Sequence, residues 1–297
     1  MPEPTSINRA VGFNKPSVDR FFEAYKAELE KKTFDASKIY NMDESGLTVV
    51  HRPGKVIAKR GQKKVGKIVS GEKGQTVTVI CSFSASGNYI HPALIFKRKR
   101  MTNRLLHGTP SGTVGYCSEN GWTNNEVFLK WLEHFTKFAK PTKDEPVILI
   151  LDGHGSHKTL AAVDFARDHG IVMISLPPHT THELQPLDLT FYGALKAHYN
   201  SECDKWMVNH PGHAYHRMIW ESCLAKLSYE QQQWKRPSVG SSHREYGHLI
   251  LIELLPSDML RPMSQRNRHH HQRPPVYRSK VIIFSTSFHY IFLLYHV

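Results

Sequence analysis

Residues 145–157, with the sequence EPVILILDGHGSH, carry the clearest indication of a fold in this chain. An apolar run from Val147 to Leu151 ends abruptly at Asp152 and Gly153. A short continuous apolar run with polar, turn-forming residues at its end is typical of a strand buried on both faces of a sheet. We therefore predict a central strand with Asp152 at its carboxyl end.

The segments on either side of this strand predict the layers around it. Residues 39–96 contain β-branched runs broken by Gly, Asn and Ser, as in neighbouring antiparallel strands. Downstream, a helix over 158–168, a second apolar run over 171–178 and a helix over 189–206 continue an alternation of strands and helices. The fold class predicted from this order is α/β, with a mixed sheet flanked by helices.

Two more helices are predicted from apolar residues at spacings of three and four, over 16–32 and over 122–140. Thr123 is the predicted N-cap of the second. Its aromatic residues, interpreted as core with stacking on unpaired bases as the alternative, are Trp122, Trp131, Phe135 and Phe138.

Composition narrows the class of protein. The 297 residues include 39 Lys and Arg against 26 Asp and Glu, a net charge of +13. This balance favours a polyanionic partner such as nucleic acid or an acidic membrane, or else a solvated basic face. The four cysteines form no CxxC pair, and the amino-terminal segment lacks the features of a secretory signal. We expect reduced thiols and no secretion, and the apolar stretch 281–297 is short and polar for a membrane span.

Three aspartates lie where predicted strands end or helices begin: Asp43, Asp152 and Asp188. Each has an ordinary alternative, because Asp43 and Asp152 could occupy turns and Asp188 could cap a helix. If they converge, their repulsion would raise their pKa values, and divalent cations would be needed to neutralise them. An oxygen-only ligand set favours Mg²⁺ or Mn²⁺ over zinc. Two such ions, about 3.5–4 Å apart, would support in-line attack on a phosphodiester.

Three segments resemble, in the right order, the catalytic blocks of DDE superfamily transposases of the pogo, Tigger, Jerky and CENP-B type. They are NMDESGLTVVHRPGKVIAKRG (41–61), VILILDGHGSHKT (147–159) and LPPHTTHELQPLDLTFYGALKAHY (176–199). Residues 2–22 resemble the connector that precedes that domain, so the resemblance covers about residues 3 to 210.

This resemblance implies a ribonuclease-H-like fold, DNA as the partner and a nuclear location. By matching motif, it places two Mg²⁺ or Mn²⁺ ions on Asp43, Asp152 and Asp188 as catalytic and metal-binding residues. A homo-oligomer is compatible with this class, and no membrane partner is expected. The alternative is a domesticated, catalytically silent DNA-binding or chromatin protein, and an RNA-processing nuclease of the same fold is a third hypothesis.

The predicted domains are a helical connector over 1–38, a DDE catalytic domain over 39–210 and a degenerate, poorly ordered tail over 211–297. The chain before Asp43 is too short for the helix-turn-helix modules that such transposases normally carry. After about His213 the sequence loses the family's helical continuation.

Basic residues and histidines complete the predicted site. The basic residues expected to contact DNA phosphates are Lys97, Arg98, Lys99, Arg100, Lys63 and Lys64. A solvated loop and a nuclear-import signal are the alternatives for the KRKR run. The histidines expected to orient carboxylates or phosphates are His154, His157, His179 and His182. A zinc site is the alternative for them, but the sequence contains no HxxxH or HExxH helix that would support it. Ser156 lacks a GxSxG context and is predicted to cap the following helix.

Overall fold

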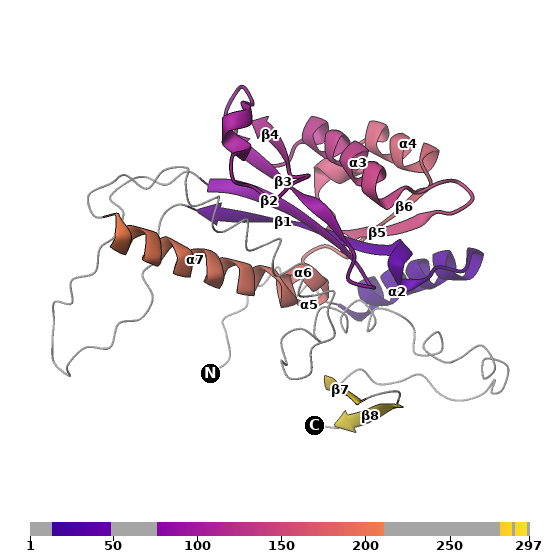
Figure 1. The fold of residues 1–297 in the computed structure, drawn as a ribbon. Helices are drawn as coiled ribbons and strands as arrows, with labels where there is room; N and C mark the ends of the chain where they lie inside the picture. The colour runs from indigo at the N-terminus through magenta and orange to yellow at the C-terminus, as the bar shows by residue number, and fades with distance from the viewer. Residues whose placement is uncertain (1–13, 49–75, 211–279, 287–288, 296–297) are drawn as a thin grey trace, which may run out of the picture. The chain divides into compact units, whose positions relative to one another are not determined.

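The computed structural model describes residues 14–48 and 76–210, and the backbone of two strands over 280–286 and 289–295 (Figure 1). The chain divides into two compact units, Met1–His248 and Leu249–Val297. The second unit contains β7 (Lys280–Thr286) and β8 (His289–Tyr295), which pair antiparallel. The predictions for Lys63, Lys64 and most of the tail lie outside the described residues, and the three predicted domain boundaries remain predictions.

The first unit is built on a six-stranded mixed sheet with the order β4-β3-β2-β1-β5-β6. The strands are β1 (Ile39–Thr48), β2 (Thr76–Ser84), β3 (Tyr89–Lys97), β4 (Val114–Ser118), β5 (Val147–Leu151) and β6 (Ile171–Ser175). Strands β1, β2 and β3 pair antiparallel, whereas β5 and β6 run parallel to β1, and β4 runs parallel to β3. The predicted α/β fold, a ribonuclease-H-like mixed sheet flanked by helices, is confirmed.

Strand β5 is the predicted central strand, and all five of its residues are buried. It lies between β1 and β6, so a strand pairs with each of its edges while helices cover its faces. Strand β1 continues to Thr48, well past the segment that pairs with β5. Asp43 therefore lies inside a strand, and the alternative that placed it in a turn is wrong.

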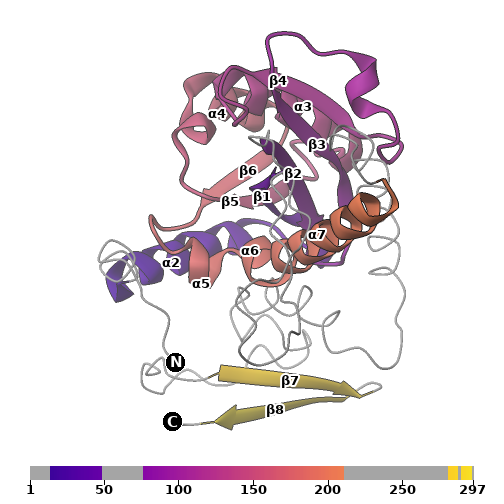
Figure 2. The ribbon, with the colours of Figure 1, turned by 90° about the vertical axis from the view of Figure 1, so that its left-hand side faces the viewer.

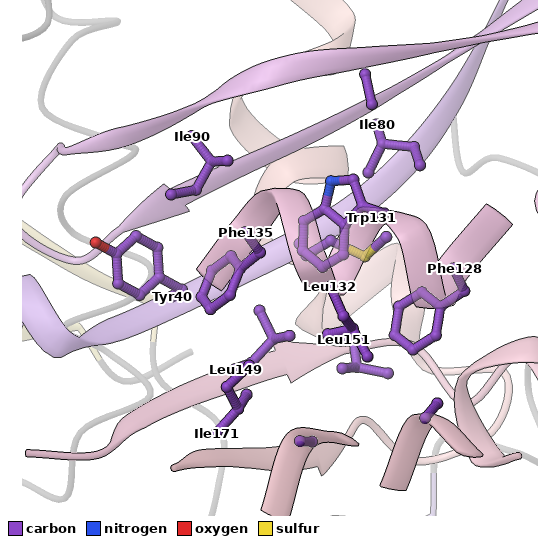
Figure 3. Packing of buried hydrophobic residues seen from close by; sticks show 14 of the residues in the cluster. Tyr40, Ile80, Ile90, Phe128, Trp131, Leu132, Phe135, Leu149, Leu151 and Ile171 are labelled. Atoms are coloured by element: carbon purple, nitrogen blue, oxygen red, sulfur yellow. The ribbon is translucent and has the colours of Figure 1, made fainter. Parts of the chain in front are cut away.

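Helices cover both faces of the sheet (Figures 1 and 2). One face carries α3 (Asn125–Ala139) and α4 (Leu160–Asp168). Their buried side chains, among them Phe128, Trp131 and Phe135, pack on Tyr40 and Met42 of β1 (Figure 3).

The opposite face carries α5 (Thr181–Leu184), α6 (Pro186–Thr190) and α7 (Tyr192–Asn209). There Phe191, Tyr192 and Leu195 pack with Leu47 of β1 and Val79 of β2. The site carboxylates have to be placed between this layer and the sheet, because Asp188 belongs to α6. The remaining helix, α2 (Lys15–Lys31), buries an apolar side and confirms the predicted helix over 16–32, shifted by one residue.

Helix starts differ from the predictions because side chains compete locally for the free backbone N–H groups. Asn124, not Thr123, caps α3, since its Oδ1 accepts from the backbone N of Val127 at 2.9 Å. Thr159 caps α4, whereas Ser156 lies in the separate 3-10 turn Gly155–Lys158 and is buried.

Two further predictions need correction. The helix predicted over 189–206 begins earlier, at Pro186, and is divided into α6 and α7. Of the four aromatic residues interpreted as core, Trp131 and Phe135 are buried, but Trp122 and Phe138 are 47% and 42% exposed. Within the described residues, no helix is both long enough and apolar enough to cross a bilayer.

Candidate active site

Asp43 lies on β1, and Asp152 directly follows β5, the neighbouring strand. In the parallel pairing of β1 with β5, Asn41 is opposite Ile150, so two residues further along each chain bring Asp43 opposite Asp152. Side chains at level positions of adjacent strands point to the same face of a sheet. Leu149 and Leu151 of β5 pack toward α3 and α4, so the alternate positions face α6 and α7.

Asp188 approaches the same place from α6. It lies in the first turn of that helix, after the N-cap Gln185, so the alternative in which Asp188 itself caps the helix is wrong. The charges that act on Asp43 indicate that the other two aspartates lie near it. Burial, followed by the charges of Asp188, Asp152 and Glu44, raises the pKa of Asp43 to about 8. Carboxylates from β1, from the end of β5 and from α6 therefore act on one another.

A buried amide pair holds α6 against the sheet. Asn41 Nδ2 donates to the carbonyl O of Ile150 at 3.1 Å and to Oε1 of Gln185 at 2.6 Å. Its Oδ1 accepts from the backbone N of Leu187 at 3.3 Å, and Gln185 Nε2 donates to the carbonyl O of Met42 at 3.3 Å. Buried amides are costly unless they are paired, so this network fixes where α6 begins.

Asn41 and Gln185 were missed by the sequence reasoning. The available signal was a polar Asn inside a buried strand and a Gln beside Pro186, both within two or three residues of a candidate ligand. A second bond joins the helical layer to β1, because the Tyr192 hydroxyl of α7 donates to the carbonyl O of Asp43 at 2.5 Å.

His157 links the carboxylates of Asp152 and Glu44 on the side of β1 that faces α3. Its Nδ1 lies 3.0 Å from Oδ1 of Asp152, and its Nε2 lies 3.4 Å from Oε1 of Glu44. The ring packs on Phe128, with 4.3 Å between ring centroids. Burial alone would lower the pKa of His157, but hydrogen bonds with Asp152 and Glu44 outweigh it and raise the pKa to about 9. The imidazole is therefore charged at neutral pH.

Asp152 responds in the opposite direction from Asp43. Burial works to raise the pKa of Asp152, but hydrogen bonds from His157 and from the backbone N of His154, the latter at 3.0 Å, hold it below its usual value. Asp152 is thus kept ionised, whereas metal-free Asp43 retains a proton to about pH 8. Glu44, the residue after Asp43 in β1, takes part in this electrostatic arrangement through its contact with His157.

The four predicted histidines separate into two groups. His154 and His157 contact Asp152 directly, while His179 precedes α5 and His182 lies within it. Ser156 Oγ is 2.8 Å from Nδ1 of His154, so it supports this loop and does not cap α4 as predicted.

The donor set suits a hard divalent cation, because it consists of carboxylates. Burial and the repulsion by neighbouring carboxylates raise the pKa of one of them, Asp43. A cation would relieve that repulsion. Within 14–48 and 76–210, no three Asp, Glu, His or Cys side chains are arranged around one ion position. Metal binding by Asp43, Asp152 and Asp188 accordingly remains a prediction.

The predicted basic residues are partly within view. Lys97 ends β3, and Arg98, Lys99 and Arg100 follow it; all four side chains are exposed. Exposure leaves them available to phosphates, and DNA contact by these residues stays a prediction.

Comparison with known proteins identifies the class. Residues 73–239, more than half of the chain, match the family described as DDE superfamily endonuclease, and the chain therefore belongs to that family. The predicted resemblance is confirmed. Asp152 and Asp188 lie within the matched residues, whereas Asp43 precedes them, so the case for Asp43 rests on the pairing of β1 with β5.

Individual relatives include proteins of different description. The chain is 32% identical over 185 residues to "MFS-type transporter clz9" of Cochliobolus lunatus, covering 59% of this chain and 19% of that protein. It is 21% identical over 176 residues to "Pogo transposable element with KRAB domain" of Homo sapiens, covering 59% and 28% respectively. The chain thus spans less than a third of the length of these curated relatives.

Among solved structures, a Mos1 transposase paired-end complex with left transposon end is similar at 13% identity and a TM-score of 0.45. The similarity covers 78% of this chain and 62% of that one. A Mos1 mariner paired-end complex with Mn is similar at 14% identity and a TM-score of 0.45, covering 75% and 62%.

Proposed function

We propose that this chain is a transposon-derived DDE endonuclease or transposase domain that cleaves or joins DNA phosphodiesters with two divalent ions. Asp43, Asp152 and Asp188 are the proposed ligands. The observation that carries the proposal is the electrostatic coupling of Asp43 to both other aspartates, although the three come from separate elements. A carboxyl group whose pKa is raised by burial and by two neighbouring aspartates has little structural value without a cation.

The protein's own groups would prepare the site in distinct ways. His157 and the backbone N of His154 hold Asp152 ionised and fix its orientation. Asn41 and Gln185 hold α6 so that Asp188 faces Asp43. When bound, two Mg²⁺ or Mn²⁺ ions would activate the attacking water or 3′ hydroxyl and stabilise the leaving oxygen. Asp43, buried beside them, would give up its proton as a ligand.

The proposed partner is DNA, in the nucleus, with Lys97 to Arg100 on its phosphates and a homo-oligomer as an arrangement compatible with the class. A net charge of +13 supports a polyanionic partner. The pogo-type relatives support a DNA transaction, since their printed name is that of a transposable element.

One observation favours the alternative of a domesticated, catalytically silent DNA-binding protein. The Asp152 carboxylate is already paired with a charged imidazole, at 3.0 Å, and a cation would have to compete with that pairing. If this pair persists in solution, the fold and the DNA affinity would remain without turnover.

The test is a nicking assay on supercoiled plasmid with the full chain and Mn²⁺ or Mg²⁺. Asp152→Asn should reduce the nicking rate by more than the roughly 10–100-fold typical of changes to groups that only support a metal ligand. Asp164→Asn, an exposed position on α4, is the matched control and should nick at the wild-type rate.

Three outcomes distinguish the hypotheses. Wild-type protein that binds DNA without nicking it would support the silent protein. Equal nicking by wild type and Asp152→Asn would exclude Asp152 as a ligand. Preferential cleavage of an RNA strand would favour the RNA-processing nuclease.

A further inference from the structure

Trp122 exposes an indole ring beside the strand that carries Asp43. Its side chain, in the segment between β4 and α3, is 47% exposed. The ring lies over Gly46 of β1, where a Cβ atom would come within 3.4 Å of the indole Cη2. Gly46 is three residues beyond Asp43, which is about 10 Å along a strand. Side chains alternate between the two faces of a strand, so the indole over Gly46 lies on the face that packs on α3, opposite to the face of Asp43.

The backbone that carries this indole is firmly held. The Ser118 hydroxyl donates to the carbonyl O of Trp122 at 2.7 Å, and the backbone N of Trp122 donates to Asn120 Oδ1 at 2.9 Å. The Thr78 hydroxyl, from β2, donates to the carbonyl O of Gly121 at 2.7 Å. A side chain whose backbone is already ordered loses less entropy when a ligand binds, so this position is prepared for a contact.

The same segment joins Trp122 to the basic run. Gly121 has a φ of +80°, and a Cβ atom there would lie 3.1 Å from Cβ of Lys97. Lys97 is the first of the four exposed cations that end at Arg100. An aromatic face next to several cations is the combination that binds single-stranded nucleic acid, since bases stack on the ring and phosphates pair with the cations.

The second exposed aromatic on this face lacks that setting. Phe138 is 42% exposed, but it packs on the rings of His91, at 4.6 Å, and His134, at 5.0 Å between centroids. It lies near the other end of α3, roughly 20 Å from the start of that helix. Phe138 is therefore a suitable control for the effect of removing an exposed aromatic ring.

We propose that Trp122 stacks on an unpaired DNA base while Lys97 to Arg100 hold the adjoining backbone. This inference rests on the proposed DNA-directed function, and it adds a site that distinguishes frayed or single-stranded ends from paired duplex.

The experiment measures binding without cleavage, with the full chain in EDTA. The probes are a duplex with a single-stranded overhang containing 2-aminopurine and a fully paired duplex of the same length. Trp122→Ala should weaken binding to the overhang about ten-fold and abolish the quenching of 2-aminopurine, because a base stacked on an aromatic ring contributes an effect of this size. Binding to the paired duplex should be unchanged.

Three further variants test whether stacking is responsible. Trp122→Phe should retain most of the quenching, whereas Trp122→Leu should lose it while keeping an apolar side chain at the position. Phe138→Ala should bind both probes as the wild type does. Circular dichroism of each variant checks that the chain is folded, and the Phe and Leu variants decide the question if Trp122→Ala is not.

Several results would overturn the inference. Unchanged overhang affinity and quenching in Trp122→Ala would do so, as would equal losses on both probes, since those indicate a contact that ignores unpaired bases. Binding of neither probe by the wild-type chain would refute the proposed DNA function itself, and is thus distinguishable from failure of the Trp122 site alone.

Discussion

Asp43 combines burial with three neighbouring carboxylates, and each of these opposes its ionisation. Its pKa is raised to about 8, while that of Asp152 is lowered by His157 and His154 despite the opposing effect of burial. The difference has two causes: Asp43 is the more deeply buried of the two, and Asp152 has hydrogen-bond partners that stabilise its charge. At the scale of single residues, the metal-free site is under electrostatic strain that is centred on Asp43.

That strain predicts a pH-dependent stability. Between about pH 4 and pH 8 the folded protein retains the Asp43 proton that the unfolded chain loses, so the stability of the metal-free protein should fall as the pH rises through this window. Asp43→Asn removes the effect. We expect the Tm of the variant to exceed that of the wild type at pH 8, by about 5 °C, and to match it near pH 4.

Differential scanning calorimetry in EDTA measures this difference, with Asp164→Asn as the control. His157 contributes a separate loss of stability as the pH rises from 6.5 through about 9, and this loss should persist in Asp43→Asn. Added Mg²⁺ should stabilise the wild type at pH 8 and have little effect on the variant. A Tm difference that does not depend on pH would contradict the assignment of the raised pKa to Asp43.

At the scale of elements, β1 and the α5–α6 segment form one supporting unit. Asn41 and Gln185 are almost completely buried and bond to each other across the boundary between strand and helix. The Tyr192 hydroxyl adds a bond from α7 to the carbonyl O of Asp43. Helix α6 has only five residues, so it depends on these contacts for its position and not on its own helical stability.

Removing one amide should therefore affect both stability and metal affinity. Asn41→Leu would remove the bonds of Asn41 to Oε1 of Gln185 and to the backbone groups of Ile150 and Leu187, and we expect a loss of about 2–4 kcal/mol in the free energy of unfolding. Because Asp188 would no longer be held against Asp43, Mn²⁺ affinity should also fall, by about ten-fold.

Urea denaturation and isothermal titration calorimetry give the two quantities. Asn88→Leu is the control, because Asn88 is exposed in the β2–β3 turn and its side chain bonds only locally to Ser86. If Asn41→Leu is destabilised while its Mn²⁺ affinity is unchanged, the amide pair supports the fold without positioning Asp188.

At the scale of the whole molecule, the charge of +13 favours a polyanionic partner, and nucleic acid is the partner proposed. Affinity of this kind depends steeply on salt, because each phosphate that is neutralised releases counterions. Because the chain belongs to the DDE superfamily, the positions of its basic residues are as informative about DNA contact as their number. The KRKR run is exposed, whereas Lys63 and Lys64 lie outside the described residues.

Salt dependence can separate a DNA-binding run from a solvated loop. If all four residues from Lys97 to Arg100 contact phosphates, changing them to Gln should reduce the slope of log K against log salt by about 3–4. The matched control replaces four cations of α2 by Gln, namely Lys15, Arg20, Lys26 and Lys31. Fluorescence anisotropy at several salt concentrations provides the slopes. Equal slopes for wild type and the Lys97 to Arg100 variant would identify the run as a solvated loop.

The sequence by itself determined the buried strand 147–151, the position of Asp152 at its end and the α/β fold, because continuous apolar runs and their spacing reflect burial directly. It also determined the family, through three segments in the right order. Helix starts were predicted less well, since several neighbouring polar residues can each accept the same backbone N–H group.

Tertiary structure alone decided which distant polar groups meet. Asn41 pairs with Gln185, and His157 links Glu44 to Asp152, although local patterns treat these residues independently. The exposure of Trp122 also depends on the tertiary structure. Their energies depend on burial and on distances of about 3 Å between groups far apart in the chain, and no local spacing specifies those.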